Sequence, residues 1–122
     1  MNNPVGWFEI YVEDLGRAKA FYETVFDLQL SELENAEIEM LAFPMRPEGY
    51  SAPVALVRMP GFSVGANSVI IYFSYFYCGV EAIKTKNAGG QIHKEKISIG
   101  QYGFIVLIAD MEGNMVGLHS MQ

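Results

Sequence analysis

The chain has 122 residues, of which 51% are hydrophobic, and 14 acidic against 8 basic side chains give it a net charge of −6. This length suits a single domain with one core, and the acidic balance disfavours the phosphate backbone of a nucleic acid as a partner. No apolar run approaches the roughly 20 residues that cross a bilayer, so we expect no membrane association. The lone Cys78 cannot form an internal disulfide and fits a reducing, cytoplasmic location.

The first half of the sequence predicts a strand, a helix and three further strands. The first strand covers about Trp7 to Val12, and the carboxylate of Asp14 can cap the helix that follows. Apolar side chains recur at helical spacing after Asp14, so we expect that helix to bury one face. Three short strands and a linker of turn-forming residues come next, at residues 28–33, 37–43, 54–57 and 60–67.

The second half repeats this order 63 residues later. A strand is expected over residues 69–74 and a helix over 79–88, which Gly89 and Gly90 end. Strands at residues 91–97, 104–108 and 115–120 complete the repeat, the last two joined by a tight turn over 110–114. We therefore expect one domain, 1–122, built from internal modules 1–60 and 66–122. A ligand is expected where the two copies meet.

Four segments carry a family resemblance: Phe8–Tyr22, Ala88–Gly90, Ile99–Phe104 and Asp110–His119. Together they resemble the vicinal oxygen chelate superfamily, the glyoxalase and bleomycin-resistance-like proteins. The resemblance implies an α+β fold in which two βαβββ modules form curled mixed sheets around a cleft. One departure is that Phe76 and Tyr77 stand where an acidic cap of the second helix is expected, so that helix either starts late or leans on a partner.

Enzymes of this superfamily hold a divalent metal with ligands from the first and last strand of each module, typically His, Glu or Gln. The corresponding positions here are Trp7, Ile70, Gly117 and, by matching the modules, a position at or near Ala55. None of these side chains donates a lone pair suited to a metal ion. Because this chain departs from the family at all four ligand positions, we expect no metal site, and we expect no other cofactor.

Polar side chains lie two residues beyond three of these positions. Because side chains alternate along a strand, Glu9 shares a face with Trp7, Tyr72 with Ile70, and His119 with Gly117. Glu9 and His119 are candidates for a catalytic base and acid if the cleft shifts their pKa values. The alternative is structural: Glu9 accepts hydrogen bonds from a neighbouring hydroxyl or amide, and His119 ends its strand in solvent.

Four aromatic side chains are candidates for lining a ligand pocket: Trp7, Tyr11, Tyr72 and Tyr102. Such rings hold flat or cationic organic molecules by stacking and cation–π contacts. Trp7 fills the space of a metal ligand, and it serves either as a stacking platform or as a plug that closes the pocket.

Two functions fit the sequence. The first is a metal-free protein that binds a small organic molecule, like the bleomycin-resistance branch of the resemblance. The alternative is an enzyme related to lactoylglutathione lyase, an isomerase or a dioxygenase, with an atypical site that uses Glu9 and His119. A purely structural dimer module with a filled cleft is a third possibility. We expect a homodimer, with which the apolar surplus and the aromatic pair Phe76–Tyr77 are compatible.

Overall fold

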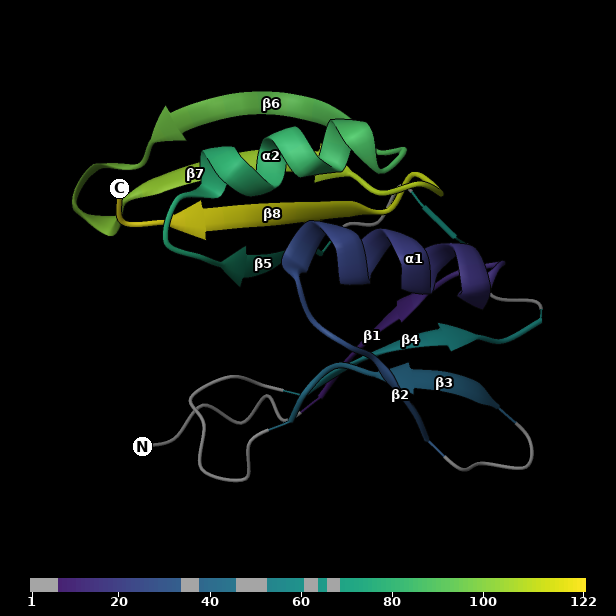
Figure 1. Ribbon diagram of the computed structural model, residues 1–122. Helices are drawn as coiled ribbons and strands as arrows, with labels where there is room; N and C mark the ends of the chain where they lie inside the picture. The colour runs from purple at the N-terminus through teal and green to yellow at the C-terminus, as the bar shows by residue number, and fades with distance from the viewer. Residues whose placement is uncertain (1–6, 34–37, 46–52, 61–63, 66–68) are drawn as a thin grey trace.

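The computed structural model describes residues 7–33, 38–45, 53–60, 64–65 and 69–122. These residues form two separate four-stranded sheets, each with one helix (Figure 1). Neither helix in these ranges is long and apolar enough to span a membrane. The predicted α+β fold of two βαβββ units with mixed sheets is confirmed.

The first sheet has the strand order β1-β4-β3-β2. β1 (Phe8–Tyr11) runs parallel to β4 (Val54–Arg58), and β3 (Glu39–Ala42) runs antiparallel to both β4 and β2 (Ser31–Leu33). The helix α1 (Leu15–Phe26) connects β1 to β2. Since β1 pairs only with β4, it forms one edge of this sheet.

The second sheet has the order β5-β8-β7-β6 and repeats the same plan. Its elements are β5 (Ile71–Ser74), α2 (Cys78–Asn87), β6 (Gln91–Ser98), the short 3-10 helix η1 (Gly100–Tyr102), β7 (Phe104–Ala109) and β8 (Met115–Ser120). Phe8 pairs with Val54 in the first sheet, and Ile71 pairs with Val116 in the second. The paired first and last strands of the two units therefore correspond in register.

The helix α1 forms where the sequence predicts it, and it packs on both sheets. The carboxylate of Asp14 accepts a hydrogen bond from the Arg17 N–H at 3.0 Å, which caps the helix. Figure 1 shows α1 between the two sheets, and its Phe26 ring stacks on Phe73 of β5 with 4.4 Å between centroids. The buried face of α1 consists of Ala18, Phe21, Tyr22, Val25 and Phe26. One helix thus joins the hydrophobic cores of the two units.

The helix α2 begins without a cap from its own sequence. Its N-cap residue, Tyr77, makes no capping bond through its side chain. Instead, the Cys78 N–H donates to the Ser120 hydroxyl, 3.0 Å away at the end of β8. The acidic cap that the sequence lacks is therefore replaced by a hydroxyl from within the same unit. Cys78 itself is fully buried, as expected for a small apolar side chain.

Candidate functional site

Two side chains of β1 and the one just before it, Trp7, meet on the face of the sheet that points away from α1. Ile10 is buried in the core beneath α1, and alternation puts Glu9 and Tyr11 on the opposite face. The Trp7 indole N–H donates to Glu9 Oε2 at 3.0 Å, and the Tyr11 hydroxyl donates to Glu9 Oε1 at 2.6 Å. The predicted shared face of these three residues is confirmed. The Glu9 carboxylate is thereby fixed between two aromatic donors.

The bond to Glu9 also holds the Tyr11 hydroxyl in its protonated form. This hydrogen bond raises the pKa of Tyr11 above its ordinary value, and partial burial and the negative charge of Glu9 act in the same direction. Tyr11 therefore donates to Glu9 throughout the neutral pH range, and it is not a candidate for a phenolate base.

A pocket of about 170 Å³ lies against the free edge of β1. Its remaining walls come from the start of β5 and from the turn into β8, so both units line it. The lining residues are Phe8–Tyr11, Gly65, Val69, Ile71 and Asn114–Val116. Glu9 and Tyr11 are among its lining residues, whereas Trp7, Tyr72, Tyr102 and His119 are not. The structure therefore divides the predicted site residues into separate groups.

The positions that correspond to metal ligands do not fit a metal ion. Ala55 pairs with Glu9 across β1 and β4, and Gly117 pairs with Tyr72 across β5 and β8, as the module match requires. Neither a methyl group nor a hydrogen coordinates a metal, and the same holds for the side chains of Trp7 and Ile70. Among the described residues, no group of three His, Cys, Asp or Glu side chains could hold a metal ion.

Tyr72 occupies the space above Gly117. A Cβ atom on Gly117 would lie 2.2 Å from Tyr72 Cδ1, so only glycine lets the tyrosine ring rest on the β8 backbone. Tyr72 remains 44% exposed on its other side. In the second unit an aromatic ring therefore covers the position that corresponds to a metal ligand.

His119 is held at the other end of β8. Its Nε2 lies 2.7 Å from the Tyr102 carbonyl oxygen, and its Nδ1 lies 3.2 Å from the Ser74 hydroxyl. A carbonyl only accepts, so Nε2 carries the hydrogen, and in the neutral ring Nδ1 accepts from the Ser74 hydroxyl. Both ring nitrogens of His119 are engaged by Ser74 and Tyr102, whereas the Glu9 carboxylate is bonded to Trp7 and Tyr11. The pairing of Glu9 with His119 as base and acid stays a prediction.

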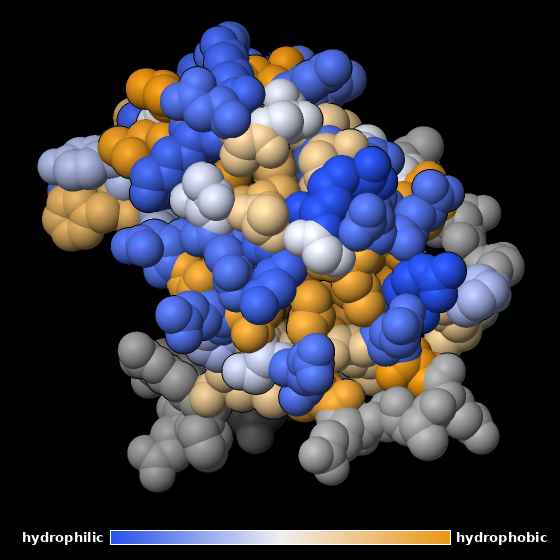
Figure 2. Space-filling view, turned by 45° about the vertical axis from the view of Figure 1, so that its right-hand side comes forward, coloured by the Kyte–Doolittle hydropathy of each residue, from blue (hydrophilic) through white to orange (hydrophobic). Residues whose placement is uncertain are grey.

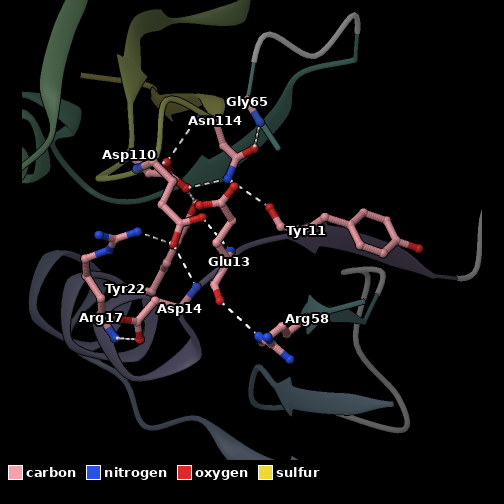
Figure 3. A network of polar contacts seen from close by, with 10 residues as sticks. Tyr11, Glu13, Asp14, Arg17, Tyr22, Arg58, Gly65, Asp110 and Asn114 are labelled. Carbon is pink, nitrogen blue, oxygen red and sulfur yellow. Dashed lines mark hydrogen bonds and ion pairs between the residues drawn. The ribbon is translucent and has the colours of Figure 1, made fainter. Parts of the chain in front are cut away.

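The turn between β7 and β8 forms a polar network with α1 that the sequence did not reveal (Figure 3). Glu112 Oε1 accepts from the Glu13 N–H at 2.6 Å, and Oε2 accepts from the Asp14 N–H at 3.0 Å. The Arg17 guanidinium donates to the same Oε2 at 2.7 Å, while the Glu112 side chain is only 4% exposed. A residue of the second unit thus binds the N-terminus of the helix of the first.

These contacts determine the acidity of Glu112. Burial acts to raise its pKa, but hydrogen bonds from the Glu13 N–H, Arg17 and the Asp14 N–H together outweigh burial and hold the pKa below its ordinary value of 4.5. The carboxylate is therefore charged wherever the fold is intact near neutral pH.

Asp110 and Asn114 close the same network from inside. Asp110 Oδ1 accepts from the backbone N–H groups of Glu112 and Asn114, both at 2.9 Å, which builds the predicted turn. Asp110 Oδ2 accepts from the buried Tyr22 hydroxyl at 2.8 Å. Burial first, and then the charge of Asp110, raise the pKa of Tyr22 well above its ordinary value. The turn over residues 110–114 is thus a contact between the two units as well as a hairpin turn. The sequence predicted the turn but not its contacts with Arg17 and Tyr22 of α1.

Comparisons with known proteins show what this chain is similar to. Residues 5–41 match the family described as bleomycin resistance protein-like N-terminal. No curated protein matches the sequence significantly. The chain therefore has the glyoxalase/bleomycin-resistance fold, and its predicted resemblance to the vicinal oxygen chelate superfamily is confirmed.

Solved structures agree on the fold over nearly the whole chain. A hypothetical protein from S. aureus aligns with a TM-score of 0.74 at 17% identity, over 98% of this chain and 95% of its own. A glyoxalase/bleomycin resistance protein/dioxygenase family enzyme from Burkholderia phytofirmans aligns with a TM-score of 0.74 at 14% identity, over 96% and 98%. The genomically encoded fosfomycin resistance protein FosX from Listeria monocytogenes gives 0.71 at 15% identity, over 98% and 94%. Identities this low establish the shared fold alone.

Proposed function

We propose that this chain binds a small organic molecule in the pocket between its two sheets, without the metal centre that the fold often carries. The observation that carries this proposal is the pocket of about 170 Å³, which both units line with apolar and polar residues, among them Glu9 with its fixed carboxylate. Concave, largely apolar sites with a few convergent polar groups are typical of ligand binding. The family match to bleomycin resistance-like proteins supports the same direction.

Binding is tested by a small-molecule screen that compares the natural chain with a blocked variant. Val69 is 64% exposed at the pocket, so Val69→Trp narrows the entrance without loss of core packing. Ile97→Trp enlarges an exposed side chain of β6 and serves as the matched control. We expect binders of the natural chain to be lost in Val69→Trp and kept in Ile97→Trp. Molecules that bind the Val69→Trp variant as tightly as the natural chain would contradict the proposed site.

Metal independence is tested on the same binders. Elemental content of the purified protein is measured, and the affinity of each binder is compared with and without a chelator. We expect substoichiometric metal and unchanged affinity, because the four corresponding positions offer no ligands. Tight stoichiometric zinc, nickel or iron that the binder requires would overturn this part of the proposal.

We also propose that the chain forms a homodimer with a second copy of itself. The proposed location of this dimer is the cytoplasm. Support comes from α2 and the residues before it, where Phe76 is 72% exposed, Ile83 64% and Val80 48%. Apolar side chains also come to the surface between polar ones on the face seen in Figure 2. Light scattering after size exclusion tests the pairing: we expect a dimer for the natural chain and a monomer for Ile83→Glu.

A further inference from the structure

The pocket beside β1 has a chemical preference that follows from its hydrogen-bonding groups. We infer that it selects a small molecule with an apolar body and one positively charged amine, which the Glu9 carboxylate binds as counter-ion. This inference rests on the proposed function and specifies the class of ligand for the same site. Glu9 is one of the residues that line the pocket, and hydrogen bonds from Trp7 and Tyr11 hold both of its carboxylate oxygens in place.

The donors of the other polar side chains in the pocket are already engaged. Asn114 donates one amide hydrogen to the Tyr11 carbonyl at 3.2 Å and the other to Asp110 Oδ2 at 3.0 Å. Its Oδ1 accepts from the Gly65 N–H at 2.9 Å. The Tyr11 hydroxyl donates its single hydrogen to Glu9. The side chains of Asn114 and Tyr11 therefore have no further hydrogen to donate to a ligand.

Acceptor capacity remains on Glu9. An ionised carboxylate offers about four lone-pair positions, and described side chains occupy one on each Glu9 oxygen. A ligand that uses the remaining positions must donate hydrogen bonds. A cationic donor gains most, because hydrogen bonds between charged groups are stronger than neutral ones and the partly apolar surroundings screen them weakly. The net charge of −6 also favours the approach of a cation over that of an anion.

The walls and the size define the rest of the ligand. Four of the lining residues are apolar: Phe8, Ile10, Ile71 and Val116. Its volume of about 170 Å³ is below the roughly 300–1,000 Å³ of sites for drug-sized molecules. The pocket therefore suits a short alkyl or cyclic amine, or the amine-bearing end of a larger molecule.

Three probes of equal length separate charge from apolar contact: n-butylammonium, 1-butanol and butyrate. Backbone amide chemical shifts are followed by NMR titration at neutral pH for the natural chain, Glu9→Gln, Glu9→Asp and Glu95→Gln. Glu95 is exposed on β6, at the opposite edge of the second sheet, and matches the charge change of Glu9→Gln. Thermal unfolding of each variant verifies that it is folded.

We expect n-butylammonium to bind the natural chain at least about tenfold more tightly than 1-butanol, and butyrate to bind most weakly. Glu9→Gln should abolish this preference and change the affinity for 1-butanol less than about twofold. Glu9→Asp should retain part of the preference, and Glu95→Gln all of it. Equal binding of the amine and the alcohol by the natural chain, or a preference that survives in Glu9→Gln, would overturn the inference while the proposed function stands. If none of the probes shifts pocket amides, both the inference and the proposed function fail.

Discussion

Single residues in this protein carry contacts between units that lie far apart in sequence. Glu112 is the clearest case, since its carboxylate accepts from two backbone N–H groups before α1 and from the Arg17 side chain. An anion at a helix N-terminus is stabilised by the unpaired N–H groups there and by the helix dipole. Exposed ion pairs usually contribute little, but the Glu112 side chain is only 4% exposed. This residue should therefore matter for stability.

Replacing Glu112 with Gln tests this contribution. The side-chain NH₂ group of Gln would replace an oxygen that accepts hydrogen bonds and would therefore face N–H donors. We expect the free energy of unfolding to fall by about 2 kcal/mol at pH 7. The folded-state pKa of Glu112 lies below its ordinary value, so the contribution of its charge is complete above about 4.5 and is lost as the pH falls through the folded-state pKa. The difference between natural chain and variant should shrink in that acidic range. A difference in urea midpoint that does not change from pH 7 to pH 3 would contradict the assignment.

At the scale of elements, the two ends of α2 are stabilised in different ways. The Cys78 N–H at its start donates to the Ser120 hydroxyl of β8, whereas its end is closed by residues of its own segment. The Gly90 N–H donates to the Thr85 carbonyl at 2.9 Å, and Gly89 has a φ of 97°. Such a left-handed glycine after the last turn is a common helix terminator. The sequence indicates the stop, whereas the cap from β8 depends on the fold.

Removal of the Ser120 hydroxyl should loosen the start of α2. We expect Ser120→Ala to lower the free energy of unfolding by about 1 kcal/mol, the usual cost of losing a helix cap. The Cys78 amide should exchange with solvent faster in the variant, while amides in the middle of α1 change only with global stability. Ser120→Thr keeps the hydroxyl and provides the control. Equal exchange of Cys78 in all three proteins would show that the bond does not cap the helix.

The two glycines after α2 should respond differently to a methyl group. A Cβ on Gly90 would lie 2.6 Å from the Ala109 carbonyl oxygen and 2.9 Å from Phe21 Cε1, so Gly90→Ala forces α2 away from its neighbours. Gly89 has no atom within 4 Å of such a Cβ, and Gly89→Ala meets only the strain of its positive φ. We expect losses of about 3 and about 1 kcal/mol respectively. Denaturant unfolding measures both, and the reverse order would contradict the predicted crowding.

At the scale of the whole molecule, the two units are expected to unfold together. The helix α1 packs on both sheets, and the turn after β7 binds α1 through Asp110 and Glu112. Coupling of this kind makes small domains unfold in one transition. The pocket depends on the same coupling, because its walls come from β1, β5 and β8.

Tyr22→Phe tests this coupling through a single hydroxyl. It removes the bond to Asp110 Oδ2 but keeps the buried ring, so we expect a loss of about 1–2 kcal/mol. Hydrogen exchange of the most protected amides should accelerate equally in β4 and in β8, since both sheets share one unfolding event. Tyr77→Phe, at a half-exposed tyrosine, is the control. Faster exchange in one sheet alone would indicate that the units unfold separately.

Local patterns in the sequence predicted most of the elements. The Asp14 cap, the apolar period of α1, the glycines after α2 and the turn at Asp110 each depend on neighbours within a few residues, and the structure places all of them where expected. The alternation of β1 likewise predicted that Trp7, Glu9 and Tyr11 share a face, which their hydrogen bonds confirm. Such features follow from backbone geometry that a short segment already determines.

The composition of the pocket was beyond the reach of these patterns. Tyr72 rests on Gly117, His119 bonds to the Tyr102 carbonyl, and neither side chain lines the pocket that contains Glu9. The alternation and spacing of residues within a strand do not determine how two sheets are placed against each other. Asn114 and Met115 could therefore not be identified from the sequence as residues that line the pocket.

The sequence by itself determined the repeated strand–helix order, the resemblance to a fold, and the absence of ligand chemistry at Trp7, Ala55, Ile70 and Gly117. The tertiary structure alone decided which side chains meet: Glu112 with the start of α1, Ser120 with the start of α2, and the edge of β1 with the turn into β8. The physical reason is range. Propensity and alternation act within a few residues, whereas these contacts join positions about 40 to 100 residues apart and form only when the two sheets pack on α1.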